Sequence, residues 1–183
     1  VVAEHWGTPM GQAVSLGIHE SQSRLWENQV GRSLGFCHFL QALLGKRLPA
    51  AAGIDPERLY AHLNRVTPGF IRVESDEISY NLHIILRFEL ERAMVEGDLA
   101  VADLPAAWND RFRALFGREV PDDARGCLQD VHWTAAFGYF PTYTLGNCYA
   151  AQFFATACQE LGDQEAAFAR GDFASLCDWL RTA

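Results

Sequence analysis

The sequence predicts an all-α fold, and two observations support that expectation. Apolar residues recur at three- and four-residue intervals in the long segments, as they do on one face of a helix. No segment shows the period-two alternation and the turn spacing of a substantial sheet. With 183 residues and 49% hydrophobic content, the chain is long enough for one core of ordinary size. We therefore expect a single helical domain over residues 1–183.

The charge balance excludes several classes of partner. The formal net charge is −8, and the fifteen Lys and Arg residues are scattered along the chain. Because phosphate binding needs concentrated basic residues, neither nucleic acid nor an anionic membrane surface is expected as a partner. No apolar run approaches the length needed to span a bilayer.

The cysteines favour a cytoplasmic location. Their number is odd, none forms a CxxC pair, and most lie among apolar residues: Cys37, Cys127, Cys148, Cys158 and Cys177. This pattern is typical of reduced, buried thiols rather than of a disulfide framework or a zinc ribbon.

The first predicted helical segment follows a turn-rich entry. Thr8 can cap a helix and Pro9 can occupy its first turn. From Met10 to about Gly45 the spacing indicates one long helix, or two helices joined near Gly31 or Gly35. Its second half is expected in the core, through Leu34, Phe36, Phe39, Leu40, Leu43 and Leu44. His38 lies alone on that stretch and is expected to be a packed histidine.

A polar run stands in the first half of this segment. Six polar residues follow one another between residues typical of a buried helix: His19, Glu20, Ser21, Gln22, Ser23 and Arg24. The run goes most of the way round a helix, so some of these groups must face inward, where they satisfy each other or bind a ligand. A solvated face is the alternative. No second metal ligand shares a face with Glu20, so any metal bound there needs ligands from another segment.

The second half of the chain opens with a short helix and a longer one. Asp55 is expected to cap a helix that begins at Pro56 and ends near Arg65. In residues 71–96, five polar residues at intervals of three and four are expected on one helical stripe: Arg72, Asp76, Tyr80, His83 and Arg87. A salt-bridged outer surface is the alternative to a functional stripe.

The remaining elements follow from helix boundary signals. Gly97 closes the helix of residues 71–96, and Asp103, Leu104 and Pro105 open another that runs to Gly117. Packing helices are then expected over Thr144–Leu161, Asp163–Phe168 and Asp172–Leu180, with Gly171 separating the last two.

Residues 126–143 combine several groups that could take part in chemistry. Gln129 and His132 are three residues apart and are expected to share a helical face, whereas Asp130 points elsewhere. Pro141 is expected to break the helix between Tyr139 and Tyr143, so spacing does not choose between the two hydroxyls. Buried aromatics with one bonded hydroxyl are the alternative reading of the two tyrosines.

Three motifs carry a resemblance to a known family. They read His19-Glu20-Ser21-Gln22, then Ile71-Arg72-Val73-Glu74-Ser75-Asp76, then Gly126-Cys127-Leu128-Gln129-Asp130-Val131-His132-Trp133. In this order they resemble the HES(Q/G), IRxxAD and GxxQDxHW motifs of the M32 metallocarboxypeptidases. Ser75 stands where that pattern has Ala, a change between small residues. The resemblance implies a helical zinc-peptidase cleft fold, of which this chain is a multi-helix lobe, and zinc-dependent release of C-terminal residues from peptides.

The fourth motif of that family, HExxH, is missing. No two of the six histidines have the i, i+4 spacing with Glu between them that places two imidazoles on one helical face. The chain also begins with Val1 rather than Met. We expect it to be the C-terminal portion of a larger enzyme, without two zinc-binding histidines and the general-base glutamate. Alone, it is expected neither to hold zinc nor to be active.

The resemblance also implies roles for individual residues. Glu20 is expected as the third zinc ligand, with His19 and Gln22 beside it. Arg72 is expected to bind the free C-terminal carboxylate of a peptide, since an arginine fork can hold a carboxylate bidentately. Asp76 is expected to orient Arg72 or a metal ligand, and Gln129 to line the substrate site.

The catalytic donors are expected in the last motif and beyond it. His132 is the first choice for a donor to the developing oxyanion, and Tyr139 and Tyr143 are candidates for the second. The implied partners are peptides with a free C-terminus and a second copy of the chain in a homodimer. A non-catalytic helical interaction domain, in which the polar clusters are buried networks, is the alternative function.

Overall fold

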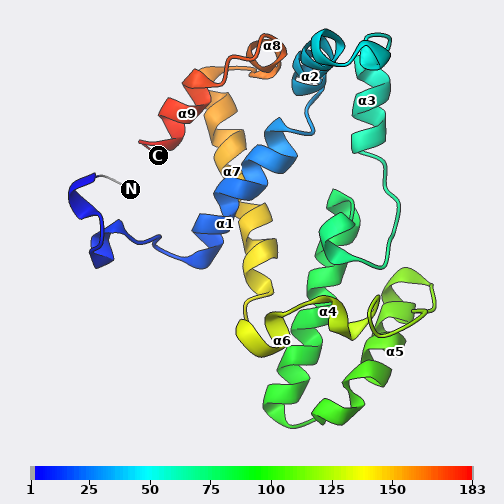
Figure 1. The fold of residues 1–183 in the computed structure, drawn as a ribbon. Coiled ribbons are helices and arrows are strands. Elements are labelled where there is room, and N and C mark those ends of the chain that lie inside the picture. Colours follow the sequence, from blue (N-terminus) through cyan, green and yellow to red (C-terminus); the bar gives the residue numbers. More distant parts are fainter. Residues whose placement is uncertain (1–2, 183) are drawn as a thin grey trace. The chain divides into compact units, whose positions relative to one another are not determined.

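The computed structural model describes residues 3–182, and every regular element in that range is a helix (Figure 1). The prediction of an all-α fold is confirmed. The α-helices are α1 (Leu16–Arg24), α2 (Leu34–Arg47), α3 (Pro56–Leu63), α4 (Glu77–Glu96), α5 (Leu104–Phe116), α6 (His132–Ala135), α7 (Pro141–Leu161), α8 (Glu165–Ala169) and α9 (Ala174–Leu180). Short 3₁₀ turns are η1 (Ala3–His5), η2 (Pro9–Gly11), η4 (Pro49–Ala51), η5 (Arg72–Glu74), η6 (Val101–Asp103) and η7 (Cys127–Gln129).

The chain divides into two compact units. The first unit comprises the residues up to Glu57 and those from Leu145 onward, and the second comprises Arg58–Thr144. Helices α3 and α7 run across the two boundaries. The expectation that the whole chain is one domain stays a prediction.

The first long helix begins later than predicted. Thr8 makes no side-chain cap, and Pro9 begins only the 3₁₀ turn η2. Helix α1 begins at Leu16, where the Oγ of Ser15 accepts a hydrogen bond of 3.1 Å from the backbone N–H of Ile18. The predicted cap at Thr8 is therefore wrong, because Ser15, seven residues later, accepts from one of the free N–H groups of the first turn.

Helix α1 continues into a π-helical segment, η3 (Leu25–Val30). The N–H of Gly31 donates to the carbonyl of Trp26, five residues earlier, over 2.8 Å. Ser33 then caps α2 by accepting from the N–H of Phe36. Two helical segments thus meet near Gly31, which is one of the two arrangements expected.

Helix α2 buries small residues rather than its large ones. Gly35 and Cys37 are buried, whereas Leu43 is 42% exposed and the other five residues expected in the core are half-buried. A Cβ on Gly35 would stand 2.3 Å from the carbonyl oxygen of Glu165 in α8. The predicted core face of α2 is therefore wrong in part, because the backbone of α8 occupies the side where α2 has no large side chain.

His38 is also placed differently from the prediction of a packed histidine. Its side chain is 44% exposed, and its Nε2 lies 3.6 Å from a carboxylate oxygen of Glu57. The helix around it is only half-buried, so the imidazole reaches solvent and an acidic neighbour.

The core of the first unit is apolar and joins α7, α8, α9 and the π-helical segment. Its buried members are Leu25, Val30, Ala150, Ala157, Phe168 and Leu176. The predicted closing helices are present as α8 and α9, with Gly171 between them at a positive φ of 74°.

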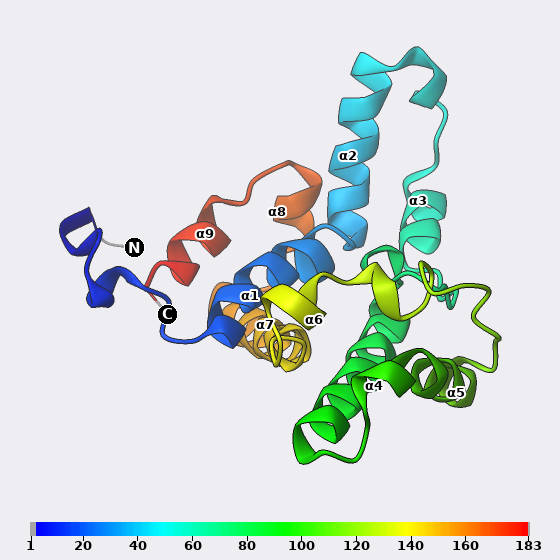
Figure 2. The ribbon, with the colours of Figure 1, turned by 60° about the horizontal axis from the view of Figure 1, so that its bottom comes forward.

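The second unit is built on α4 and α5, which lie side by side (Figures 1 and 2). Both helices end where predicted, with Gly97 at φ 84° and Gly117 at φ 66°, conformations that glycine adopts without strain. In the first unit, Asp55 Oδ1 accepts from the N–H of Glu57 over 3.2 Å at the start of α3, as its predicted capping role requires. The buried core around α4 and α5 comprises Leu86, Leu90, Leu104, Trp108, Phe112 and Cys127.

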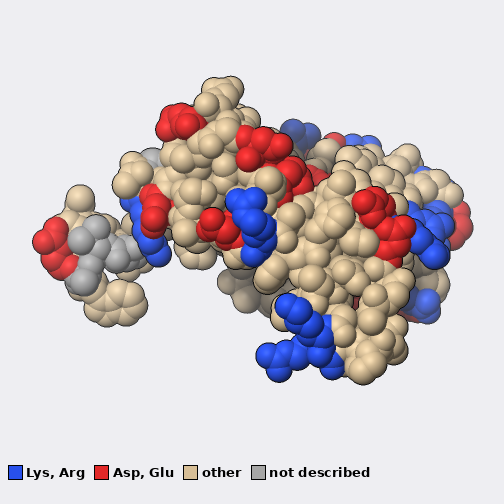
Figure 3. Space-filling view, turned by 90° about the horizontal axis from the view of Figure 1, so that it is seen from above, with Lys and Arg blue, Asp and Glu red and all other residues tan. Residues whose placement is uncertain are grey.

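The surface carries both acidic and basic side chains. Figure 3 shows them in small separate groups with uncharged surface between them. The expected absence of nucleic-acid and membrane partners stays a prediction. In residues 3–182, no helix is long and apolar enough to cross a membrane. All five cysteines are free, and Cys148 is exposed, so the expectation of buried thiols is wrong for that residue.

Candidate functional site

Asp130 lies at the centre of a buried polar cluster in the second unit. Its Oδ1 accepts from Nε and Nη2 of Arg72 over 3.0 and 2.8 Å. Its Oδ2 accepts from Nε of Arg87 over 2.6 Å. The side chains of Arg72, Arg87 and Asp130 are 7%, 0% and 4% exposed. One carboxylate therefore holds two buried guanidinium groups, from η5 and α4, in fixed positions.

The charges in this cluster stabilise each other. Burial acts to raise the pKa of Asp130, but Arg87 and Arg72 outweigh it and hold the pKa below its ordinary value. Burial lowers the pKa of Arg87 to about 10, although Asp130 opposes the shift, so the guanidinium stays charged at neutral pH. The cluster thus contains one negative and two positive charges.

Aromatic rings complete the surroundings of the two arginines. The guanidinium of Arg87 lies 4.6 Å from the ring centroid of Trp108. That of Arg72 lies 4.8 Å from the ring of Tyr143, and its Nη1 donates to the hydroxyl of Tyr80 over 2.9 Å. Ring faces favour a cation, so they offset part of the cost of burying these charges.

Arg72 does not lie on the predicted helical stripe. It begins the 3₁₀ turn η5, while α4 begins only at Glu77, and Asp76 caps that helix. Tyr80, His83 and Arg87 do lie on α4, as predicted. The stripe is therefore wrong for Arg72 and Asp76. Arg72 lies in η5, before the extended residue Ser75, and Asp76 is the cap of α4 rather than one of its helical residues.

Asp76 has its own structural contacts. Its Oδ1 accepts from the N–H of Ser79 over 2.8 Å, and its Oδ2 accepts from the N–H of Thr67 over 2.9 Å. Burial acts to raise the pKa of Asp76, but these N–H groups outweigh it and the pKa is lowered. In the structure, the carboxylate that orients Arg72 is Asp130 rather than Asp76.

Gln129 ties two segments together through its side-chain amide. Its Oε1 accepts from the backbone N–H of Arg72 over 2.9 Å. Its Nε2 donates to the carbonyls of Phe70, Arg125 and Gly126 over 3.0, 3.1 and 3.0 Å. These contacts fix the backbone of Arg72 against the last motif. Its expected place in the substrate site stays a prediction.

His132 and Tyr143 form a pair. The Nε2 of His132 lies 3.0 Å from the hydroxyl of Tyr143, and its Nδ1 lies 3.7 Å from Oδ1 of Asp130. Burial, and then the nearby charge of Arg72, lower the pKa of His132, so the imidazole is neutral at pH 7. We assign its proton to Nδ1, facing the carboxylate, so that Nε2 accepts from Tyr143.

Gln129 and His132 do not share a helix. Gln129 ends the 3₁₀ turn η7, Asp130 is extended, and His132 begins α6. The predicted common helical face is therefore wrong, and the extended residue explains how Asp130 reaches the centre of the cluster.

The two candidate tyrosines lie on either side of a helix start. Helix α7 begins at Pro141, as the expected break requires. The ring of Tyr139 lies 5.3 Å from that of Tyr143 and 5.9 Å from that of His132. Phe140 is fully buried, with its ring 4.5 Å from His132. The hydroxyl of Tyr143 lies against the imidazole.

Glu91 anchors the loop that carries these rings. Glu91 is only 3% exposed, and its Oε1 accepts a hydrogen bond of 2.7 Å from the N–H of Gly138. Burial raises its pKa. It lines an apolar hollow of about 230 Å³ together with Phe88, Val95, Phe137 and Pro141.

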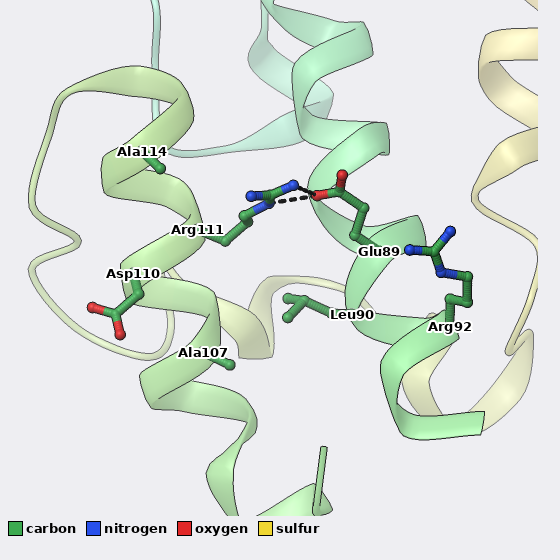
Figure 4. Close-up of a pocket in the computed structure, with 7 residues that line it drawn as sticks. All are labelled: Glu89, Leu90, Arg92, Ala107, Asp110, Arg111 and Ala114. Atoms are coloured by element: carbon green, nitrogen blue, oxygen red, sulfur yellow. Dashed lines mark hydrogen bonds and ion pairs between the residues drawn. The ribbon is translucent and has the colours of Figure 1, made fainter. Parts of the chain in front are cut away.

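A second hollow, of about 350 Å³, lies between α4 and α5 and is lined by charged side chains (Figure 4). Glu89 and Arg111 form an ion pair across it, and Arg92 and Asp110 lie at its edges. None of the residues expected in the site lines this hollow. Its ion pair is half-exposed, so it contributes little to stability.

The first unit holds the remaining predicted residues. Ser21 is fully buried and Arg24 is 5% exposed, which confirms that part of the polar run of α1 faces inward. Glu20 is half-buried, His19 is exposed, and Gln22 donates to the Oγ of Ser21 over 3.4 Å. The expected roles of His19 and Gln22 beside a metal stay predictions.

Glu20 fits the role of one metal ligand. Within residues 3–182, its carboxylate has no hydrogen bond or ion pair, so both oxygens are available. No group of three His, Cys, Asp or Glu side chains that could hold a metal ion comes together in the same range. The described residues therefore offer one carboxylate ligand, whereas a catalytic zinc takes three protein ligands.

Sequence reasoning missed one residue in each unit. Asp130 was expected to point away, and Arg24 was given no role, although its Nε donates to Oδ1 of Asn147 over 2.6 Å. The signal for Asp130 was available, because Arg72 and Arg87 among apolar residues need a carboxylate partner.

Known proteins resemble this chain over nearly its whole length. A family model described as Carboxypeptidase Taq (M32) metallopeptidase matches residues 1–183. Thermostable carboxypeptidase 1 of Thermus thermophilus is 52% identical over 179 residues, which are 97% of this chain and 35% of that protein. Thermostable carboxypeptidase 1 of Pyrococcus furiosus is 44% identical, over 95% of this chain and 35% of that protein.

A solved structure shares the fold. The M32 carboxypeptidase from Deinococcus radiodurans R1 superposes with a TM-score of 0.91 at 47% identity, covering 98% of this chain and 37% of that one. This chain therefore spans about a third of the length of the proteins it matches.

Proposed function

Since this chain belongs to the M32 family of metallopeptidases, we propose that it is the part of a zinc-dependent carboxypeptidase that supplies one metal ligand and the oxyanion donors. The reaction proposed for the whole protein is hydrolysis of the last peptide bond of a substrate with a free C-terminus. The observation that supports it best is the pairing of His132 with Tyr143 over 3.0 Å, beside the charged cluster of Asp130.

Glu20 is the residue proposed to hold the metal. Its carboxylate has no other partner among the described residues, and carboxylate oxygens are regular zinc ligands. Glu20 would hold a zinc ion there, and the chemistry supplied by the bound ion would be activation of a water near neutral pH. Two further ligands and a general base are required, and the sequence of this chain has no HExxH motif to provide them.

Tyr143 is proposed to donate to the oxyanion that forms at the substrate carbonyl, with His132 as the residue that positions its hydroxyl. The neutral imidazole holds the tyrosine hydroxyl in place, and that hydroxyl can turn to donate to the developing negative charge. The negative charge of Asp130, 3.7 Å from Nδ1, favours a proton on that nitrogen, and the two arginines keep Asp130 ionised.

Arg72 remains the proposed binder of the substrate carboxylate, but its contacts limit that role. Its Nε, Nη1 and Nη2 already donate to Asp130 and Tyr80. Its positive charge therefore acts on a substrate carboxylate mainly through the field around Tyr143, rather than through a free guanidinium fork.

The direct experiment measures metal content and activity together. The full-length protein and its Glu20→Gln variant are purified, titrated with Zn²⁺ and assayed on a blocked dipeptide with a free C-terminus. We expect the variant to lose stoichiometric zinc and hydrolysis, with its fold retained. Full hydrolysis by the variant would exclude Glu20 as a ligand. A parent protein that neither holds stoichiometric zinc nor hydrolyses the dipeptide would favour the non-catalytic helical interaction domain.

A further inference from the structure

In the first unit, helix α1 and the part of helix α7 from Leu145 onward approach each other closely at two glycines. A Cβ added to Gly17 of α1 would stand 3.2 Å from Cε2 of Tyr149. A Cβ added to Gly146 of α7 would stand 2.8 Å from Cγ, 2.9 Å from Cβ and 3.2 Å from the backbone carbon of Glu20. The two helices cross in both ribbon views (Figures 1 and 2).

The glycine at position 146 is not required by the conformation of the backbone. It lies inside α7, and its φ is not among the positive values. In a helix interior, alanine is favoured over glycine. Gly146 is therefore best explained by its contact, because the stem and backbone of Glu20 occupy the space of a side chain.

The same helix face has a second fixed point one turn after Glu20. The Nε of Arg24 donates to Oδ1 of Asn147 over 2.6 Å, and its Nη1 donates to Glu27 over 2.6 Å. Arg24 is 5% exposed. Gly17, Glu20 and Arg24 are three and four residues apart, so they lie on one face of α1 against α7.

These contacts hold the stem of Glu20 and leave its head group available. Its Cβ and Cγ lie against Gly146, while its carboxylate makes no hydrogen bond or ion pair with residues 3–182. A metal ligand needs this combination, since its oxygen must be fixed in space before the ion binds.

We propose that Gly146 is a positioning residue that sets where the carboxylate of Glu20 lies. This inference rests on the proposed role of Glu20 as a metal ligand. A methyl group at position 146 would displace Glu20, and because one of the crowded atoms belongs to the backbone, a rotamer change cannot relieve all of the contact.

The test uses Zn²⁺ alone as the probe. The full-length protein and its Gly146→Ala variant are stripped of metal and titrated with Zn²⁺ against a chelating indicator. We expect G146A to bind Zn²⁺ about 10- to 100-fold more weakly, as when supports of metal ligands are removed. The absorption spectrum of the Co²⁺-loaded protein should also shift, because it reports the arrangement of the ligands.

Two further glycine variants are matched controls. Gly53→Ala adds a methyl where nothing lies within 4 Å. Gly35→Ala crowds the carbonyl of Glu165 at 2.3 Å and so disturbs the fold away from Glu20. We expect both folded variants to bind Zn²⁺ and Co²⁺ as the parent does. If G146A does not fold, Gly17→Ala replaces it as the variant that crowds the contact between α1 and α7. We expect a smaller loss of affinity for Zn²⁺ in that variant, because the atom nearest to the new methyl belongs to the side-chain ring of Tyr149.

The outcomes separate this inference from the proposed function. If Glu20→Gln loses Zn²⁺ while G146A binds as the parent does with an unchanged Co²⁺ spectrum, the positioning role is wrong and the ligand stands. If G35A loses as much affinity as G146A, the loss reports general unfolding and the positioning role is again wrong. If Glu20→Gln keeps its affinity, the proposed function itself fails.

Discussion

The Nε of Arg87 donates a hydrogen bond of 2.6 Å to Oδ2 of Asp130, and neither side chain is more than 4% exposed. A buried ion pair has no water to replace a lost partner. Asp130 also accepts from a second arginine, Arg72. Removal of the Asp130 carboxylate therefore leaves two buried positive charges without a partner.

We therefore expect Asp130→Asn to destabilise the protein by about 3–5 kcal/mol, the usual cost of removing one partner of a buried pair. Denaturant unfolding of the full-length protein measures this. Asp178→Asn is the control, because the side chains of Asp178 and Arg181 are 73% and 74% exposed, and exposed pairs contribute less than about 1 kcal/mol. Equal effects in both variants would contradict the central position of Asp130.

His83 should make the stability fall in acid. It is fully buried, its Nε2 lies 3.2 Å from the carbonyl of Gly69, and burial with the charge of Arg87 lowers its pKa to about 4. In the unfolded chain, His83 takes up a proton near pH 6.5. The contribution of neutral His83 to the free energy of unfolding is therefore complete above that pH and is lost as the pH falls toward 4. The shift corresponds to about 3 kcal/mol.

The measurement is the free energy of unfolding as a function of pH between 4 and 7. We expect His83→Gln to flatten the profile in this window. His62→Gln, at an exposed position of α3, should leave the slope unchanged. A parental slope in His83→Gln would show that another group carries the proton.

Tyr143 should be the hydroxyl that matters for hydrolysis. Its hydroxyl lies 3.0 Å from Nε2 of His132. Removing an oxyanion donor typically lowers kcat by about 10²- to 10³-fold, and we expect Tyr143→Phe to do so with a small change in KM. Tyr60→Phe, with Tyr60 40% exposed, is the control. A larger loss of kcat in Tyr139→Phe would assign the donor to Tyr139 instead.

Glu91 should distinguish loss of a hydrogen bond from loss of a charge. Glu91→Ala leaves the N–H of Gly138 without its acceptor, and we expect a cost of about 1–3 kcal/mol in thermal or denaturant unfolding. Glu91→Gln keeps an acceptor oxygen. Because burial raises the pKa of Glu91 in the folded state, the parent loses stability as the pH rises through that pKa. The glutamine variant should not show this loss.

The sequence predicted most helix boundaries because they depend on local signals. Gly97, Pro105, Gly117 and Pro141 act through their own backbone conformations, and the structure has a helix end or start at or beside each of them. The resemblance carried by the three motifs is confirmed by the match to the M32 family. These features need no knowledge of distant contacts.

The candidate site was less predictable because its contacts join residues far apart in sequence. Asp130 meets Arg72 and Arg87 across 58 and 43 positions. Helical spacing also failed where the backbone is not α-helical, as between Gln129 and His132. Spacing in the sequence shows whether two residues share a helix face only if the backbone between them is helical. Asp130, which is extended, interrupts the helix between Gln129 and His132.

The π-helical segment Leu25–Val30 bears on how this region tolerates changes in length. A π-helical turn accommodates one residue more than an α-helical turn, so deletion of a single residue between positions 25 and 30 could be absorbed by a return to α-helical winding. A deletion or an insertion within α1 would instead turn Glu20 by about 100° relative to its neighbours on the same helix face. A change between Gly17 and Glu20 would turn it relative to Gly17, and a change between Glu20 and Arg24 would turn it relative to Arg24. Sequence alignments of this region should therefore place any length variation after Arg24.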